Sequence, residues 1–131
     1  MEHKNYLIDT NAIIDFMASR LPETGMSFLS SVINHQTNIS VITQIELLGF
    51  NGPKEDMALL EDFVDESIVH FLDKPIVQTC IELRKYNKIR LPDAIIAATA
   101  KLKNLDLVTR NTKDFESLEG LEVVNPHKLE L

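Results

Sequence analysis

Four acidic residues of this chain stand beside apolar runs, where a carboxylate could meet the protein core. They are Asp9, Glu46, Asp93 and Asp114. Asp9 directly follows the apolar run Tyr6-Leu7-Ile8. A carboxylate next to the core is costly to desolvate unless it is paired or bound to a cation. If the four acids converge, their mutual repulsion calls for a divalent metal ion.

Two of these acids also have an ordinary structural explanation. Asp9-Thr10-Asn11 is a typical helix N-cap sequence, in which the two residues after Asp9 can do the capping and leave its carboxylate free. The spacing Thr43-x-x-Glu46 fits a capping box, in which the glutamate folds back onto the cap residue. Both explanations stay open beside the metal hypothesis.

Asp93 precedes a run that is apolar on all sides, residues 94–98, so we expect a buried helix there. An acid at the start of a helix is stabilised by the helix dipole. The same position would also aim the carboxylate of Asp93 into a central cleft.

Asp15 lies four residues after Asn11, and we expect it on the helix surface or as a partner of a metal-binding residue.

The fourth acidic position has two candidates, Asn111 and Asp114, and the residue types do not decide between them. The segment 111–114 is again a possible helix cap with an acid in the first turn. Thr109, just before this segment, can hydrogen-bond a water held by a metal ion. Arg110 and Lys113 can contact phosphate, or they can simply be exposed.

Short apolar strands alternate with helical patterns along the chain. We expect strands at 6–9, 39–42, 68–71, 106–109 and 122–124, and helices at about 11–19, 24–36, 43–50, 54–66, 75–87 and 93–103. Strands separated by helices indicate βαβ units. Such units predict a parallel sheet with helices on both faces. The length of 131 residues, with no visible linker, indicates a single α/β domain spanning 1–131.

This architecture brings the acids together. Ligands of open parallel sheets bind outside the carboxyl ends of the strands. Asp9 ends the first strand, Glu46 follows the second closely, and residues 109–114 follow the fourth. Asp93 opens a helix whose N-terminus should lie along the same edge. We therefore expect all four acids near one rim of the sheet.

Composition narrows the class of protein. The net charge of −7 argues against broad, non-specific binding to nucleic acid. The charge is uneven, however: residues 44–73 hold one basic residue against eight acids, whereas residues 80–113 hold eight basic residues. That basic segment is either a solvated surface or a wall that holds a phosphate backbone.

A single cysteine, Cys80, fits a reducing cytoplasm. The polar residues 1–5 show neither a signal peptide nor a membrane span.

Other active-site chemistries lack their residues. The chain has no Gly-x-Gly-x-x-Gly or Walker A loop and no Gly-x-Ser-x-Gly elbow, and its four histidines show no zinc-ligand spacing. A magnesium-dependent phosphoacceptor receiver domain remains an alternative. It would use Asp73 after the third strand, but Asp73 is better placed to cap the next helix, and the late lysine of that class is not evident.

Taken together, these motifs resemble a known family. The runs 7–11, 91–97 and 107–115, with Glu46 between them, look like the PIN domain and, more narrowly, like the VapC-type toxins of toxin–antitoxin pairs. The resemblance extends from Tyr6 to about Val124. Many PIN domains carry an aspartate where this sequence has Asn111, so Asp114 is an alternative for the fourth position, directly or through water.

The resemblance implies a PIN-like three-layer α/β/α fold with a central parallel sheet of four to five strands. It implies an endoribonuclease dependent on Mg²⁺ or Mn²⁺, ions that prefer oxygen ligands. Such toxins are typically homodimers that a small antitoxin protein neutralises. The resemblance implies catalytic and metal-binding roles for Asp9, Glu46 and Asp93, with Asp114 or Asn111. The supporting residues are Thr10, Asn11 and Thr109, and the RNA-binding residues are Arg90, Arg110 and Lys113. A non-catalytic PIN module that only binds a partner is the main alternative.

Overall fold

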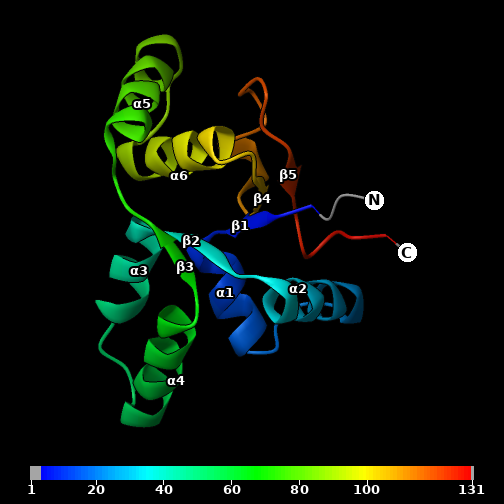
Figure 1. The fold of residues 1–131 in the computed structure, drawn as a ribbon. Coiled ribbons are helices and arrows are strands. Elements are labelled where there is room, and N and C mark those ends of the chain that lie inside the picture. The colour runs from blue at the N-terminus through cyan, green and yellow to red at the C-terminus, as the bar shows by residue number, and fades with distance from the viewer. Residues whose placement is uncertain (1–3, 131) are drawn as a thin grey trace.

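A computed structural model describes residues 4–130 as a five-stranded parallel sheet covered by helices on both faces (Figure 1). The sheet order is β3-β2-β1-β4-β5. The strands are β1 (Tyr6–Ile8), β2 (Asn38–Ser40), β3 (Ile68–His70), β4 (Asp106–Val108) and β5 (Val123–Val124). The α/β fold predicted from the alternating pattern is confirmed, with five strands. The expectation of neither a signal peptide nor a membrane span concerned residues 1–5. Of these, residues 1–3 lie outside the described residues.

Six α-helices connect the strands. They are α1 (Thr10–Met17), α2 (Glu23–His35), α3 (Val41–Leu48), α4 (Lys54–Asp65), α5 (Lys74–Tyr86) and α6 (Leu91–Leu102), followed by a short 3₁₀ helix, η1 (Thr112–Asp114). Each lies within two residues of its predicted limits. None of the helices in the described residues is long and apolar enough to cross a membrane.

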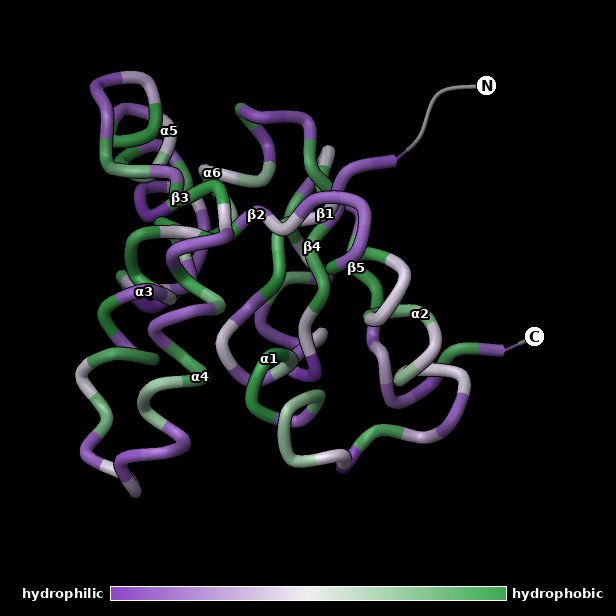
Figure 2. Tube along the Cα trace, turned by 60° about the horizontal axis from the view of Figure 1, so that its bottom comes forward, coloured by the Kyte–Doolittle hydropathy of each residue, from purple (hydrophilic) through white to green (hydrophobic). Residues whose placement is uncertain are grey.

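Alternate residues of the central strands face two separate cores. Leu7 and Leu107 pair across β1 and β4 and pack with α5 and α6, whereas Ile8 and Val108 pack with α1, α2 and α4. This alternation is the two-residue period of a strand buried on both faces. Figure 2 shows hydrophobic stretches along β1 and β4 in the middle of the molecule. Helices α4 and α5 instead alternate hydrophobic and hydrophilic segments, as expected of helices packed on one side.

The boundary between β2 and α3 differs from the prediction. The strand ends at Ser40, whose hydroxyl accepts a hydrogen bond from Ile42 N at 3.1 Å, so that α3 begins at Val41. Ser40 is therefore the N-cap, and Thr43 lies inside the helix. The capping-box explanation of Thr43 and Glu46 is wrong, and the side chain of Glu46 is free to serve another purpose.

Helix α6 begins at Leu91, two residues before its predicted start at position 93. Arg90 is its N-cap and Pro92 stands in its first turn, where the missing N–H of proline costs nothing. Every residue from Asp93 to Ala100 is buried. The alanines of this run allow the helix to lie close to the sheet, which fixes the first turn of α6 at the rim.

The sheet order places a topological switch point between β1 and β4. The chain runs from β1 outward through β2 to β3 and then returns to the other side of β1. In open α/β sheets, ligands bind outside the carboxyl ends of the strands at such a point. Asp9 follows β1 and Thr109 follows β4, so these two residues stand on either side of it.

Candidate metal site

A pocket of about 340 Å³ opens at this switch point. Three of the four predicted acids reach it from separate elements: Asp9 before α1, Glu46 from α3 and Asp93 from α6. Asn111 lines it from the segment after β4. Asp114 is exposed in η1 and is not among the lining residues. Of the two candidates for the fourth position, Asn111 is thus the one that faces the pocket.

Asp9 is the N-cap of α1, and its carboxylate is 7% exposed. One oxygen, Oδ1, accepts a hydrogen bond from Thr10 N at 2.9 Å. The other, Oδ2, accepts from Thr109 Oγ1 at 2.8 Å and from Asn11 Nδ2 at 3.2 Å. The expectation that Thr10 and Asn11 would cap the helix and leave Asp9 free is wrong. Asp9 takes the cap position itself and still points its second oxygen across to β4.

No basic side chain of residues 4–130 donates a hydrogen bond to Asp9. Burial raises the pKa of Asp9, the hydrogen bonds from Thr109 and Thr10 lower it, and the negative charges of Glu46 and Asp93 raise it again, with a net rise above 3.8. All of its hydrogen-bond donors in the described residues are neutral. A carboxylate in this position gains from any positive charge that enters the pocket.

Thr10 and Thr43 hold Glu46 toward the pocket. Thr10 Oγ1 lies 2.7 Å from Glu46 Oε1 and 3.1 Å from Thr43 Oγ1. Since a hydroxyl carries a single hydrogen, Thr10 donates to the carboxylate and accepts from Thr43. The supporting position predicted for Thr10 therefore has a concrete contact. Thr43, fully buried, was not expected to take part.

Asp93 is 9% exposed and its Oδ2 lies 3.2 Å from Arg90 Nε. Arg90 itself is exposed and lines the pocket together with Arg110 and Arg20. Lys113 is exposed and is not among the lining residues. Arg20 was missed because nothing in its local sequence, the end of a short turn after α1, links it to the rim.

The oxygen donors fit a hard divalent cation, but the arrangement is open. Carboxylate and amide oxygens are the ligands that Mg²⁺ and Mn²⁺ prefer, and the raised pKa of Asp9 indicates an uncompensated negative charge. Within residues 4–130, no three His, Cys, Asp or Glu side chains are grouped so as to hold an ion as they stand. The reason is visible in two contacts: Glu46 is turned to Thr10 and Asp93 to Arg90. Arg90 is exposed and Thr10 is half-buried, and both line the pocket.

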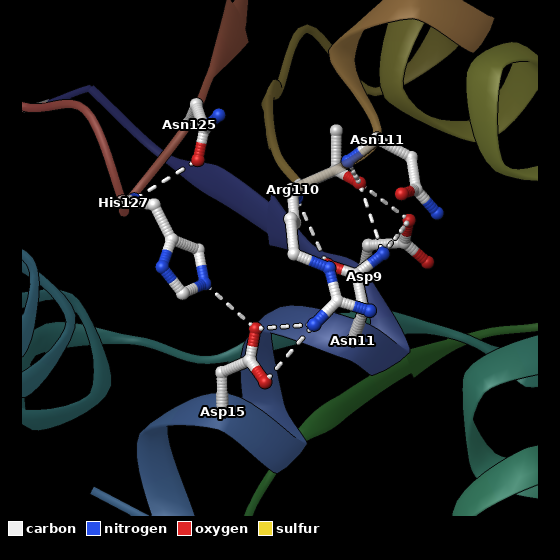
Figure 3. A network of polar contacts seen from close by, with 8 residues as sticks. Asp9, Asn11, Asp15, Arg110, Asn111, Asn125 and His127 are labelled. Atoms are coloured by element: carbon white, nitrogen blue, oxygen red, sulfur yellow. Dashed lines mark hydrogen bonds and ion pairs between the residues drawn. The ribbon is translucent and has the colours of Figure 1, made fainter. Parts of the chain in front are cut away.

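Asp15 also lines the pocket, but its carboxylate is committed to other groups. It is 1% exposed, and its partners are Arg110 and His127 (Figure 3). The expectation of a surface acid is wrong, and the alternative of a partner side chain is closer to what the structure shows. Asp73, the acid that a receiver domain would need, is the N-cap of α5, with Oδ1 accepting from Ile76 N at 3.0 Å.

The protein is an α/β domain whose parallel sheet carries acids at its switch point, one after β1 and one in the first turn of α6. These acids form a candidate cation site with oxygen ligands. Residues 6–121 match the PIN domain family, and the chain belongs to it.

Three relatives place the chain more narrowly within that family. Toxin FitB of Neisseria gonorrhoeae is 31% identical, with 92% of this chain and 96% of the relative covered. Ribonuclease VapC1 of Methanocaldococcus jannaschii is 31% identical, with 93% and 88% covered. A solved toxin–antitoxin complex from Klebsiella pneumoniae contains a chain with a TM-score of 0.75 and 30% identity, covering 95% of this chain and 100% of that one.

Proposed function

We propose that this protein is a metal-dependent endoribonuclease and the toxin of a toxin–antitoxin pair. The observation that carries the proposal is the pocket at the switch point, which Asp9, Glu46 and Asp93 all line and where burial and the two neighbouring acids raise the pKa of Asp9. The similarity to Toxin FitB and Ribonuclease VapC1 over nearly the whole chain supports the same activity.

Asp9, Glu46 and Asp93 would hold Mg²⁺ or Mn²⁺, with Asn111 at the fourth position. When bound, such an ion supplies activation of a water molecule and neutralisation of charge on the scissile phosphate. The chain supplies the orientation. Thr109 and Asn11 fix Oδ2 of Asp9, and Thr10 fixes Glu46.

The RNA backbone would lie across the arginines at the pocket mouth. Arg90 contacts Asp93 through Nε alone and Arg110 contacts Asp15 through Nη1, so each keeps further N–H donors for a phosphate. A guanidinium is suited to this because its donors match two phosphate oxygens at once. Lys113 is exposed one turn farther along and would add charge rather than a defined contact.

A groove beside the acid pocket fits the antitoxin. It measures about 390 Å³ and lies between α1, α3 and α4, with Met17, Phe50 and Leu59 exposed along it. Ile14 and Glu46 line both the groove and the acid pocket. We propose that an amphipathic helix of the antitoxin occupies the groove, with its apolar side chains in the groove and a lysine or arginine reaching Glu46. Phe50→Glu should then cleave RNA normally and escape neutralisation by the antitoxin; continued neutralisation would place the antitoxin elsewhere.

The homodimer stays a prediction of the resemblance. Val77 and Ile81 are both exposed and, being four residues apart, share one face of α5. We expect this face to contribute to the contact between two copies. Sedimentation analysis at micromolar concentration checks this, and a monomer that Ile81→Glu does not alter would contradict it.

The activity is tested by cleavage of a mixed cellular RNA. We expect cleavage that EDTA abolishes and Mn²⁺ restores, and a loss of at least about a thousandfold in Asp9→Asn, because this change removes the charge at the centre of the site. Asn keeps the size and the cap acceptor of Asp9, so the variant stays folded. Cleavage that persists in purified Asp9→Asn would reveal a contaminating nuclease and sink the proposal. Absence of cleavage by the wild-type protein with Mn²⁺ would favour a module that only binds a partner.

A further inference from the structure

The C-terminal segment after β5 reaches back to α1 and contacts it next to the pocket. His127 Nε2 lies 2.8 Å from Asp15 Oδ2, across 112 positions of sequence (Figure 3). As a carboxylate, Asp15 only accepts hydrogen bonds, so the imidazole carries its hydrogen on Nε2. Arg110 Nη1 lies 3.1 Å from the same oxygen and 3.3 Å from Oδ1. The buried carboxylate is thus held from two sides, by the segment after β4 and by the C-terminal segment.

From Asp15 a continuous set of contacts leads to Asp9. The backbone N–H of Arg110 donates to Asn11 Oδ1 at 2.9 Å. Asn11 Nδ2 in turn donates to Asp9 Oδ2 and to Thr109 Oγ1, each at 3.2 Å. One amide group makes all three contacts and so links the backbone of Arg110 to Asp9 and Thr109.

The same contacts fix the fourth position of the site. Asn111 N donates to Thr109 Oγ1 at 3.1 Å, and Thr109 donates to Asp9. The segment 109–111 is therefore attached to α1 at Asp9, at Asn11 and, through the Arg110 side chain, at Asp15. Removing the last attachment would let the segment turn away from the pocket while β4 stays in the sheet.

The C-terminal turn is built to deliver His127. Asn125 Oδ1 accepts from His127 N at 2.9 Å, and Lys128 N donates to Asn125 O at 3.1 Å, which closes a tight turn around buried Pro126. The turn rests on α2 at Gly25, where an added Cβ would lie 2.0 Å from Pro126 O. Only glycine lets the turn approach α2 this closely.

We infer that Asp15 and His127 are positioning residues of the metal site: the C-terminal turn holds Asp15 through His127, and Asp15 with Arg110 fixes Asn11, Asp9 and Asn111. The inference rests on the proposed function, because it concerns the same site. It also separates the roles of the acids that line the pocket, since Asp15 orients the ligands and does not bind the ion.

The test measures Mn²⁺ affinity of the purified, folded full-length protein by calorimetry. Changes to side chains that orient metal ligands typically weaken binding by 10–100-fold. We expect Asp15→Asn to weaken Mn²⁺ binding about tenfold and His127→Ala by a smaller factor. His127→Gln, whose amide N–H replaces that of Nε2, should restore the wild-type affinity. Since His127 acts through Asp15, adding His127→Ala to Asp15→Asn should have no further effect.

A second perturbation reaches the turn from the far side. Gly25→Ala should displace Pro126 and weaken Mn²⁺ binding as His127→Ala does, although Gly25 lies on α2 and does not line the pocket. Ser30→Ala, at an exposed position of the same helix, is the matched control and should change nothing. A merely structural role of the turn would lower thermal stability in these variants and leave the Mn²⁺ affinity of the folded protein unchanged, which would overturn the inference.

The backbone amide signal of Arg110 in the metal-free protein gives an independent measurement. His127→Ala should shift it, because the hydrogen bond to Asn11 changes, and His127→Gln should return it. An unmoved signal overturns the inference even if Mn²⁺ affinity falls. Wild-type protein that neither binds Mn²⁺ nor cleaves RNA would instead overturn the proposed function, and the amide signal would still decide whether His127 and Asp15 hold the 109–111 segment.

Discussion

Asp9 and Asp15 are two buried carboxylates six residues apart on the same stretch of chain, and their surroundings are opposite. Asp15 has an arginine and a histidine within hydrogen-bond distance. Within the described residues, the hydrogen-bond donors to Asp9 are all neutral, and the carboxylates of Glu46 and Asp93 raise its pKa. Burying a charge is costly unless it is paired. The protein provides a partner for one charge and leaves the other without one.

The difference distinguishes a structural acid from a functional one. Asp15 is satisfied by the chain itself, so it gains little from an ion. Asp9 carries a raised pKa, which means that its ionised form is destabilised in the folded protein. Perturbed groups of this kind gather at functional sites because the missing interaction is supplied by a ligand. The comparison therefore predicts opposite responses of the two positions to cations and to mutation.

Added Mn²⁺ should have the largest effect on stability. An ion that binds only the folded state stabilises it by about 2.7 kcal/mol at a concentration 100 times its Kd. We expect the Tm of the wild-type protein to rise by several degrees with Mn²⁺, and the Tm of Asp9→Asn to be unaffected. The measurement is thermal denaturation at fixed ionic strength. It is repeated with Ca²⁺, a second ion that prefers oxygen ligands. An equal rise in wild type and Asp9→Asn would mean that the ion binds elsewhere.

The matched substitutions Asp9→Asn and Asp15→Asn should change the metal-free stability in opposite directions. Removing one member of a buried ion pair costs about 3–5 kcal/mol. Arg110 is half exposed and can turn to solvent, so we expect a smaller loss of about 2 kcal/mol for Asp15→Asn. Asp9→Asn should raise the Tm at neutral pH, because it removes a charge repelled by Glu46 and Asp93. The measurement is the free energy of unfolding in urea, or the Tm. If both substitutions change it in the same direction, the two sites do not differ as proposed.

Most of the fold could be predicted from the sequence because its information is local. Short apolar strands alternate with helical patterns, and this alternation alone implies parallel βαβ units. The boundary between β2 and α3, which is displaced by two residues, lies in a stretch of β-branched residues that favours a strand. There the hydroxyl of Ser40 caps Ile42 and starts the helix earlier than the side-chain pattern indicates.

The acid site was predictable for a similar reason. Once the sheet is parallel, residues that follow its strands share one rim, so Asp9, Glu46 and Asp93 were expected to meet. The fourth position was not predictable, because Asn111 and Asp114 are three residues apart and only the course of η1 decides which faces the pocket.

The Asp15 network could not be read from the sequence at all. Its members come from α1, from the segment after β4 and from the C-terminal turn, and the contact between Asp15 and His127 spans nearly the whole chain. No short motif carries such a contact. The single local sign was that Asp15 stands four residues after Asn11 and therefore on the same side of α1.

The smallest expected effect is on pH dependence, and it isolates Asp9. Its folded-state pKa lies above the ordinary value of 3.8, so its contribution to stability is fully present below that value and is lost as the pH rises through the raised pKa. The Tm advantage of Asp9→Asn over the wild type, measured without divalent ions, should therefore be small near pH 4 and grow toward neutral pH. With saturating Mn²⁺ the Tm advantage of Asp9→Asn should disappear or reverse, because the ion supplies the positive partner that the Asp9 carboxylate lacks. An advantage that stays constant from pH 4 to pH 7 would mean that the buried carboxylate of Asp9 is already neutralised within the protein, and that the pocket has no need of a cation.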